Sequence, residues 1–407
     1  MKTTTLLLAL SLAAAPAAPR PAAEATALPP APPPQSCLER AHADPADFAA
    51  ELCASMSLDD KIAQMVMSYP PLDKAGPVTV GAVILLGPLL KSAKSIRARS
   101  ADLQARARIP LLVAVDMEGG QLNRLQSVPA LKDAPSGKAL GEMSEADAEA
   151  WGQKLGRQMR ELGLNCNLGP VLDLAESGHM FERERSMGAD AATVARVAAA
   201  YVRGMRAEGV VGFGKHFPGY GAVAENSDHD LVLSDRSPEE LSRQAEPFFA
   251  LGDLLGGVLL TNIAFRDKGG QPAILSPEIV AMAHGRERDW VTMTDDIAVA
   301  PLRQATGGDA AEVVRRAFHA GNDILLTTAP IDWDKAIDLR GIIKAEVERA
   351  PALHRRIDVS VLRILRLKER MGLLDGLKAQ RLRSADSVGS VGSSDRGAPH
   401  HPTAAAL

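Results

Sequence analysis

Short apolar runs rich in Val, Ile and Leu recur along the chain, and segments with helical spacing separate them. The eight runs are MVMSY, VGAVILL, IPLLVAVD, NCNLGPVLDL, VVGFGKHF, GGVLLTNI, DWVTMTD and NDILLTT. In the intervening segments apolar residues recur every three or four positions, and most of these segments end at Gly. Strands that are apolar on both faces and alternate with helices are typical of a parallel sheet covered by helices.

Eight such units in a chain of 407 residues predict an α/β fold in one domain, a (β/α)₈ barrel of the TIM type. An open, doubly wound parallel sheet is the alternative. No G-x-G-x-x-G motif follows the first run, so a dinucleotide-binding fold has no support. The formal net charge is −4 and the basic residues are dispersed, which argues against a nucleic-acid partner.

The N-terminal sequence MKTTTLLLALSLAAAPAAPRPAAEATA has the pattern of a secretory signal peptide over residues 1–25. Lys2 supplies the positive charge, residues 6–15 form a short apolar run, and AEA at 23–25 is a small-residue cleavage site. The apolar run is too short for a membrane span, which needs about 20 residues. We therefore expect an exported protein, periplasmic or secreted, with no membrane span after signal removal; a short anchoring helix is the alternative.

Composition divides the rest of the chain into three parts. Residues 26–44 contain the Pro-rich stretch TALPPAPPPQS and are expected to form a linker. Residues 45–376 carry the alternating pattern and form the barrel domain. The Ser-, Gly- and Pro-rich residues 377–407 are expected to be a disordered tail.

The chain has three cysteines. In an exported protein Cys37 and Cys53 could form a disulfide, and the sequence leaves open whether they do. Cys166 stands in an apolar stretch and is expected to be buried and free.

Polar and charged residues stand where several of the apolar runs end. In a barrel these carboxyl ends form the active-site face. Charged groups at so many strand ends are costly unless they share one site. Carboxylates beside cations suit a polyhydroxylated ligand, because each hydroxyl both donates and accepts a hydrogen bond. The residues in question are Asp116, Arg183, Glu184, Arg185, Lys215, His216, Asn262, Asp295 and Asp296.

The motifs around these positions resemble glycoside hydrolase family 3, in its single-domain β-N-acetylhexosaminidase branch. In family order, the matching segments are SLDDKIAQMVM, VAVDMEGGQLNRL, LGPVLDL, ERS, GKHFPGYG, MTDD and RIDVSVLRILRLKERMGLL. The resemblance covers nearly all of residues 45–376. It implies a retaining hydrolase that removes terminal β-linked N-acetylglucosamine, with peptidoglycan fragments as one candidate substrate and with no metal or organic cofactor.

By position, the resemblance implies that Asp295 is the nucleophile that forms a covalent glycosyl-enzyme. It implies that the sugar is bound by Asp116, Arg124, Arg185, Lys215 and His216. An anionic carboxylate suits the positively charged anomeric carbon of the transition state. Lys215 and the arginines are expected to keep Asp295 and Asp116 ionised. Asp296 is the rival nucleophile, and it is expected to point away if Asp295 ends the strand. A structural ion network at the barrel mouth is the alternative role for these charges.

The loop after GKHFPGYG departs from the family pattern. Where that branch has an Asp-Ser-His dyad, this chain has Asn226, Ser227 and Asp228, followed by His229. Three further departures are Gln121 for an Arg, Tyr220 for a His and Asn262 for a His.

Three hypotheses follow for the general acid/base. Asp228 acts itself, as the second carboxylate of a retaining pair. Alternatively His229 acts, with Asp228 or Asp230 orienting its ring. In the third, neither acts, the cluster is a solvated loop, and the protein is a catalytically impaired glycan-binding or sensing protein. His229 is slightly favoured over Asp228, because imidazole needs less pKa adjustment to work near neutral pH.

A β-glucosidase-like hydrolase is a further alternative, because GYGAVAE also resembles the glucosidase branch of the family. Those enzymes take their acid/base from a second domain, which is not expected in this chain.

Overall fold

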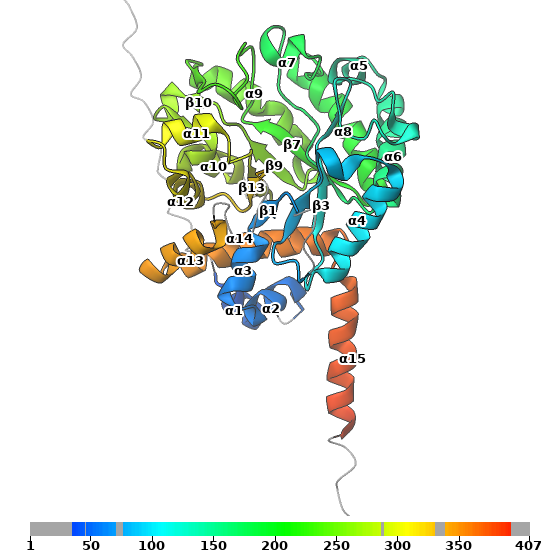
Figure 1. Cartoon of the computed structure of the whole chain (residues 1–407), viewed down its shortest axis with the longest axis vertical. Coiled ribbons are helices and arrows are strands. Elements are labelled where there is room, and N and C mark those ends of the chain that lie inside the picture. Colours follow the sequence, from blue (N-terminus) through cyan, green and yellow to red (C-terminus); the bar gives the residue numbers. More distant parts are fainter. Residues whose placement is uncertain (1–34, 45, 71–75, 286–288, 330–337, 392–407) are drawn as a thin grey trace, which may run out of the picture. The chain divides into compact units, whose positions relative to one another are not determined.

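The computed structural model describes residues 35–44, 46–70, 76–285, 289–329 and 338–391, and side chains as far as residue 383. Eight parallel strands follow one another around the sheet in chain order (Figure 1). They are β1 (Val66–Ser68), β2 (Ala82–Ile84), β3 (Leu112–Val115), β6 (Cys166–Asn167), β7 (Val211–Phe217), β9 (Gly257–Leu260), β12 (Val291–Thr294) and β13 (Leu325–Thr327). β13 pairs with β1, and a parallel bridge from Met293 to Ile324 links β12 to the residue before β13. The sheet is therefore a nearly closed barrel, which confirms the predicted (β/α)₈ fold and excludes the open sheet.

Each predicted apolar run contains one of these strands. All residues of β3 and β7 are buried, as expected for strands that face both the barrel interior and the surrounding helices. The helices around the barrel are α3 (Leu58–Gln64), α4 (Ala93–Arg106), α6 (Glu145–Glu161), α8 (Ala191–Ala207), α9 (Pro238–Leu251), α10 (Pro277–His284), α12 (Ala310–Ala320), α13 (Leu339–Arg349) and α14 (Leu353–Arg370).

Local sequence explains how these helices begin and pack. Ser144 accepts a hydrogen bond from the backbone of Asp147 at the start of α6, and Ser237 forms a capping box at the start of α9. α6 packs so closely against α8 that a Cβ at Gly152 would lie 2.1 Å from the Tyr201 carbonyl oxygen. Close helix packing thus requires glycine at this position.

The loops at the carboxyl ends of the strands carry the shorter elements. They are β4 (Met117–Gly119), β5 (Leu122–Asn123), α5 (Gly137–Gly141), α7 (Gly178–Glu182), β8 (Leu233–Ser234), β10 (Ala264–Phe265), β11 (Gln271–Pro272) and α11 (Ala300–Ala305). β4 and β5 form a hairpin directly after β3. The backbone N–H of His179 in α7 donates to the Val223 carbonyl, 2.7 Å away, so α7 contacts the loop that follows β7. These loops build the rim of the site described below.

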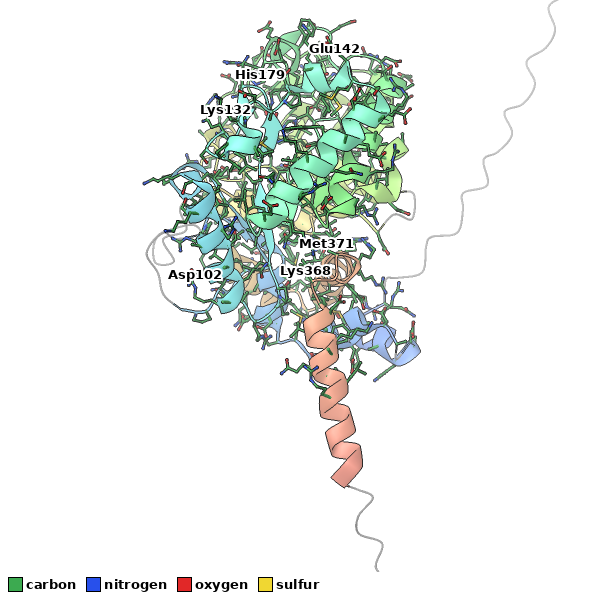
Figure 2. The ribbon with its side chains drawn as sticks, turned by 90° about the vertical axis from the view of Figure 1, so that its right-hand side faces the viewer. Asp102, Lys132, Glu142, His179, Lys368 and Met371 are labelled. Carbon is green, nitrogen blue, oxygen red and sulfur yellow. A yellow bond between two sulfur atoms is a disulfide. The ribbon has the colours of Figure 1, made fainter. Side chains whose placement is uncertain are left out.

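A buried lysine of α14 bonds to residues at the adjacent end of the barrel. The ammonium of Lys368 donates to Gln64 Oε1 at 2.7 Å and to the Gly81 carbonyl at 2.9 Å. The residue is completely buried, and burial lowers its pKa to about 7. Figure 2 shows Lys368 and Met371 toward the end from which α15 extends, and His179 and Glu142 near the other end.

The expected linker over residues 26–44 is wrong at its C-terminal end. Residues 1–34 lie outside the described part, but α1 (Cys37–Ala43) and α2 (Phe48–Ser55) are folded against α14. Ser36 begins α1 with a capping box, and Cys37 is buried. The Pro-rich composition ends before Ser36, so averaging over 26–44 concealed a helix that belongs to the barrel domain.

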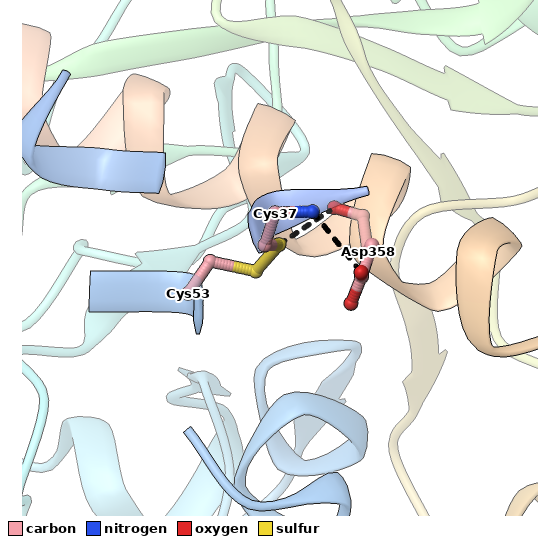
Figure 3. A group of neighbouring side chains, drawn as sticks. All are labelled: Cys37, Cys53 and Asp358. Atoms are coloured by element: carbon pink, nitrogen blue, oxygen red, sulfur yellow. Dashed lines mark hydrogen bonds between the residues drawn. A yellow bond between two sulfur atoms is a disulfide. The ribbon is translucent and has the colours of Figure 1, made fainter. Parts of the chain in front are cut away.

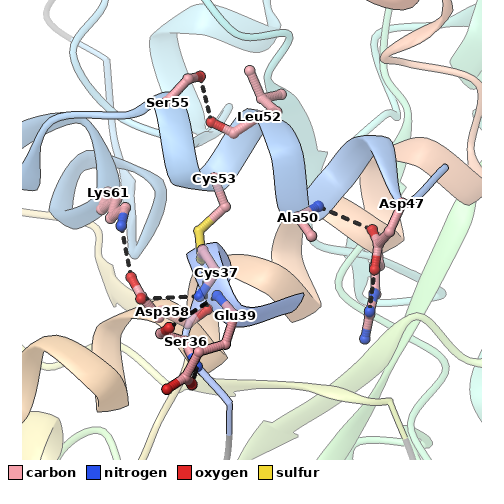
Figure 4. Close-up of a disulfide and its surroundings, with 11 residues drawn as sticks. Ser36, Cys37, Glu39, Asp47, Ala50, Leu52, Cys53, Ser55, Lys61 and Asp358 are labelled. Atoms are coloured by element: carbon pink, nitrogen blue, oxygen red, sulfur yellow. Dashed lines mark hydrogen bonds and ion pairs between the residues drawn. A yellow bond between two sulfur atoms is a disulfide. The ribbon is translucent and has the colours of Figure 1, made fainter. Parts of the chain in front are cut away.

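The Cys37–Cys53 disulfide is formed and joins α1 to α2 (Figure 4). Asp358 of α14 accepts from the Cys37 N–H at 3.1 Å and from Lys61 Nζ at 2.7 Å. Cys166 is free and buried, as predicted. The disulfide therefore joins the two N-terminal helices to each other, and Asp358 ties the first of them to α14, the closing helix of the barrel.

The expected disordered tail is wrong for residues 377–391, which form most of α15 (Asp375–Val391). Residues 375–384, DGLKAQRLRS, contain several strong helix formers, and Leu374 before them is buried. Lys378 lies over the Phe48 ring, and Arg381 pairs with Glu51. Residues 392–407 lie outside the described part. No described helix is long and apolar enough to cross a membrane.

Replacing both disulfide cysteines, in the variant Cys37→Ser/Cys53→Ser, is expected to lower the free energy of unfolding. The two residues are 16 positions apart, and a loop of this length corresponds to a loss of about 3 kcal/mol. Chemical denaturation measures the loss. Reductant should reproduce it in the wild type and add nothing in the double variant; an additional loss there would contradict the assignment.

Candidate active site

One cavity of about 330 Å³ opens among the loops at the carboxyl ends of the strands. It contains every sugar-binding residue that the sequence predicted, together with the predicted nucleophile and both acid/base candidates. The predicted residues that line it are Asp116, Arg124, Arg185, Lys215, His216, Asp228, His229 and Asp295. Residues from the ends of four strands, β3, β6, β7 and β12, and from the loops that follow them therefore meet in a single site, as the barrel topology requires.

Lys215 and His216 are adjacent in β7, and both side chains reach the cavity. Side chains that are neighbours in a regular strand point to opposite faces. In β7 the register with β9 shifts between Lys215 and Phe217, and this irregularity accompanies the shared orientation.

Glu118 holds two of the cavity cations. Its carboxylate lies 2.6 Å from Lys215 Nζ and accepts two hydrogen bonds from the Arg185 guanidinium, at 2.7 and 2.9 Å. Lys215 also pairs with Asp116. Burial would raise the pKa of Glu118, but the charges of Lys215 and Arg185 outweigh it and keep that pKa well below its usual range. This carboxylate is a fixed anion that orients the cations toward the cavity.

Asp173 does the same for His216. The His216 ring nitrogen Nδ1 lies 2.7 Å from Asp173 Oδ2, and the backbone N–H of His216 donates to Oδ1 at 3.0 Å. Asp173 is completely buried. With Nδ1 facing a carboxylate, the Nε2 atom lies beside Arg185, 3.3 Å away. The ring is thereby fixed in one orientation.

Sequence reasoning did not select Glu118 or Asp173, although both stand in the quoted motifs. Glu118 lies two residues after Asp116 in DMEGG, and Asp173 is the Asp of VLDL. Neither lines the cavity. The available signal was an acidic residue within an otherwise apolar strand end, since such a residue requires a partner when it is buried.

Asp295 follows the last residue of β12 and faces the cavity. Burial, and after it the negative charge of Asp228, raises the pKa of Asp295 to about 7 despite the opposing charges of His216 and Lys215. Desolvation thus opposes the expected effect of the cations, which favour the ionised form of Asp295. The dependence on Asp228 also shows that the two carboxylates lie within electrostatic reach of each other.

Asp296 was expected to point away from the site, but it also lines the cavity. Its carboxylate is nevertheless occupied. Oδ1 accepts from the backbone of Ala298 at 3.0 Å and of Thr328 at 3.1 Å, and the Thr328 hydroxyl donates to Oδ2. These bonds fix the loops after β12 and β13, whereas Asp295 accepts from the Asp296 N–H at 2.8 Å.

The loop after β7 forms one helical turn at the mouth of the cavity. Asn226 begins it: its side chain accepts from the Asp228 N–H at 3.1 Å, and its carbonyl accepts from His229 and Asp230, both at 2.9 Å. Asp228 and His229 are exposed and line the cavity. Among the described residues, neither Asp228 nor Asp230 forms a hydrogen bond to the His229 ring.

Two other departures from the family pattern have distinct surroundings. Gln121 is exposed and accepts from Arg183 at 3.3 Å, which links the β4–β5 hairpin to α7. Asn262 is buried, and its amide nitrogen and oxygen have no hydrogen-bond partner among the described residues.

Cys37, Cys53 and Asp358 bring three potential metal-ligating atoms together, two sulfurs and one carboxylate oxygen (Figure 3). The two sulfurs are bonded to each other, and Asp358 is held by Lys61 and by the Cys37 N–H. In the oxidised protein this group is a structural anchor, far along the chain from every cavity residue named above.

The fold and the site define a glycoside hydrolase of the (β/α)₈ class. The chain belongs to glycoside hydrolase family 3: the family's "Glycosyl hydrolase family 3 N terminal domain" matches residues 57–367. This match spans the barrel from α3 to α14.

Relatives of the chain carry the name β-hexosaminidase. The chain is 31% identical to that of Bordetella avium (strain 197N) over 258 residues, which is 61% of this chain and 73% of the relative. It is 30% identical to that of Stenotrophomonas maltophilia (strain R551-3) over 269 residues, 63% of this chain and 79% of the relative.

Solved structures with related names have the same fold as this chain. The family 3 β-N-acetylglucosaminidase from Paenibacillus sp. str. FPU-7 superposes with a TM-score of 0.69 at 27% identity, over 78% of this chain. The present chain spans 63% of that protein's length. The β-N-acetylhexosaminidase from Beutenbergia cavernae DSM 12333 gives a TM-score of 0.69 at 28% identity, over 78% of this chain and 99% of the other.

Proposed function

We propose that this glycoside hydrolase removes terminal β-linked N-acetylglucosamine with retention of configuration, with Asp295 as nucleophile and Asp228 as general acid/base. The observation that carries the proposal is that both carboxylates line one cavity with the five predicted sugar-binding residues. At about 330 Å³ the cavity stands at the lower end of the usual range for ligand sites, ~300–1,000 Å³, which suits a single terminal sugar. The names of the relatives above support N-acetylglucosamine as that sugar.

In the first step an ionised Asp295 oxygen forms a bond to the anomeric carbon. The bond from that carbon to the leaving oxygen breaks, and protonated Asp228 gives its proton to that oxygen. The sugar ring becomes positively charged on the way, and the anion of Asp295 stabilises it. Asp116 accepts from sugar hydroxyls, while Lys215, Arg185 and Arg124 donate to them.

In the second step Asp228, now ionised, removes a proton from water. The water oxygen attacks the anomeric carbon, the ester bond to Asp295 breaks, and Asp295 leaves as a carboxylate. The sugar departs with its original configuration, and both carboxyl groups return to their starting protonation states.

Asp228 is preferred to His229 because of its electrostatic relation to Asp295. Its charge is the main cause, after burial, of the raised pKa of Asp295. Two carboxylates that influence each other across a sugar site form the usual retaining arrangement. The hypothesis for His229 relied on a carboxylate that orients its ring, and neither Asp228 nor Asp230 bonds to that ring in the described part of the chain. Both loop residues line the cavity, which supports catalysis over glycan binding alone.

The pH profile should reflect the raised pKa of Asp295. Below about pH 7 Asp295 is protonated and cannot attack, so kcat/KM is expected to fall as the pH drops through that value. In Asp228→Asn the like charge is gone, and the acid limb should move to lower pH. An activated dinitrophenyl glycoside is the suitable substrate, because its leaving group needs little acid assistance.

The matched control is Asp230→Asn, which removes one charge from the same loop but from a residue outside the cavity lining. Its acid limb should stay in place. An acid limb that is identical in Asp228→Asn and wild type would contradict the electrostatic link between Asp228 and Asp295.

The function itself is tested with aryl β-N-acetylglucosaminides and aryl β-glucosides. The proposal expects cleavage of the first substrate, with proton NMR showing the β-anomer as first product. Preferential cleavage of the glucoside would favour the β-glucosidase-like alternative. Binding of N-acetylglucosamine without cleavage of either substrate would favour a glycan-binding protein.

We also propose that the protein is exported and acts on peptidoglycan fragments with terminal β-linked N-acetylglucosamine. The signal-like N-terminal pattern and the Cys37–Cys53 disulfide support an oxidising compartment. Cell fractionation with mass analysis of the N-terminus tests export, and retention of residues 1–25 in a cytoplasmic protein would refute it. Release of N-acetylglucosamine from purified peptidoglycan fragments tests the substrate.

A further inference from the structure

The buried side chain of Tyr220 joins the end of β7 to the loop that carries Asp228. Its hydroxyl donates to the Glu225 carbonyl at 2.8 Å and accepts from the Ser227 N–H at 2.7 Å. Tyr220 is 2% exposed, and burial raises its pKa, so the phenol keeps the proton that it donates. One hydroxyl thus holds the backbone on both sides of Asn226.

The backbone of Tyr220 is itself firmly held. Its N–H donates to Asp173 Oδ1 at 2.7 Å, the same oxygen that accepts from the His216 N–H. From the other side, Arg236 donates to the Gly219 carbonyl at 2.9 Å and to the Tyr220 carbonyl. The carboxylate that fixes the sugar-site histidine therefore also fixes the anchor of the loop.

The remaining bonds carry this constraint to the acid/base. Asn226 caps the turn that contains Asp228 and His229, through its side chain and its carbonyl. Because the hydroxyl of Tyr220 holds the residues before and after Asn226, it fixes the start of this turn. Asp228 lines the cavity from this turn.

We infer that Tyr220 is a positioning residue for general acid/base catalysis, which acts by holding the Glu225–Ser227 backbone so that Asp228 faces the bond to be cleaved. This inference rests on the proposed function for the identity of the acid/base. Tyr220 is not among the described residues that line the cavity, so its hydroxyl acts through the loop and not on the substrate. Loss of the hydroxyl should lower kcat/KM for substrates whose cleavage is limited by acid assistance. The affinity for the sugar should not change.

The test is Tyr220→Phe, which removes the hydroxyl and keeps the ring. With a phenyl β-N-acetylglucosaminide, a poor leaving group, kcat/KM should fall on the order of 10- to 100-fold, the usual cost of misplacing a catalytic group. With the dinitrophenyl glycoside it should change only a few-fold, at about 3-fold or less, because little acid assistance is needed. The inhibition constant for N-acetylglucosamine should stay at the wild-type value.

Tyr201→Phe is the matched control. Tyr201 is also buried, and its hydroxyl accepts from Asn167 at 3.4 Å, away from the loop. It should show no selective loss with the phenyl substrate. Ser227→Pro is a second test: it removes the N–H that bonds to Tyr220 at the first position of a helical turn, where proline is tolerated. It should reproduce the loss if Tyr220→Phe fails to fold.

Amide hydrogen exchange of the peptide over residues 221–232 provides a readout that needs no catalysis. Exchange should rise in Tyr220→Phe and stay at the wild-type level in Tyr201→Phe. Unchanged exchange, or an equal loss with both substrates, would overturn the positioning role while leaving the proposed function intact. A wild type that cleaves neither substrate would refute the proposed function, and the exchange result would still decide whether Tyr220 holds the loop.

Discussion

Replacing Asp295 by alanine is expected to reduce hydrolysis of every aryl glycoside on the order of 10⁴- to 10⁶-fold, the range seen when an enzyme loses its nucleophile or the group that supports it. The covalent intermediate requires an oxygen at the end of β12, and Asp295 is the carboxylate there that faces the cavity without being occupied by neighbouring loops. An activated leaving group cannot compensate, because the missing group attacks carbon and does not protonate oxygen. Steady-state kinetics with the dinitrophenyl glycoside measures the loss.

Azide makes this test specific. In Asp295→Ala a small anion can enter the vacated space and attack the anomeric carbon directly, which gives a glycosyl azide of inverted, α configuration. Asp296→Asn is the matched control, since its amide oxygen still accepts from Ala298 and Thr328. Asp296→Asn should retain most of the activity. An active Asp295→Ala enzyme, or an inactive Asp296→Asn enzyme that is folded, would transfer the role to the neighbouring residue.

The barrel could be predicted from the sequence because its strands are buried on both faces. Such strands appear as continuous apolar runs, and each of the eight runs contains one strand of the sheet. The ends of the domain could not be predicted in the same way. Composition describes a segment as an average, and the average over 26–44 concealed the capped, disulfide-bonded helix that begins after Ser36. At the other end, the helix formers at the start of α15 are followed by Ser- and Gly-rich residues, and the average over 377–407 concealed the helix.

The site shows a similar division. The residues that the motifs selected all line one cavity, since each stands at the end of a barrel strand or in the loop that follows it. Glu118 and Asp173 act through Lys215, Arg185 and His216, so no spacing rule selects them. The pKa of Asp295 was also beyond sequence reasoning. It depends on how far burial and the charge of Asp228 outweigh the nearby cations, and that balance exists only in the folded chain.

Replacing Asp228 by alanine is expected to produce a loss that depends on the leaving group. With the phenyl glycoside, kcat/KM should fall ~10²–10⁴-fold, the usual contribution of general acid catalysis. With the dinitrophenyl glycoside the first step needs little protonation, so glycosyl-enzyme should form at nearly the wild-type rate and then accumulate, because its hydrolysis lacks a base. A burst of dinitrophenol followed by slow turnover is the expected time course.

Azide again identifies the group. In Asp228→Ala it needs no base to attack the glycosyl-enzyme, so it should raise the turnover rate and yield the β-glycosyl azide, opposite in configuration to the product expected from Asp295→Ala. His229→Ala is the matched control, because His229 lines the same cavity from the next position in the turn. In His229→Ala we expect no loss of kcat/KM that depends on the leaving group, and no increase in turnover with azide. If the burst and the azide rescue belong to His229→Ala instead, the imidazole is the acid/base, and the charge of Asp228 serves to tune Asp295. If neither variant shows them while Asp295→Ala is inactive, the nucleophile works without acid assistance from this loop, and the cavity is adapted to substrates whose leaving groups depart unaided.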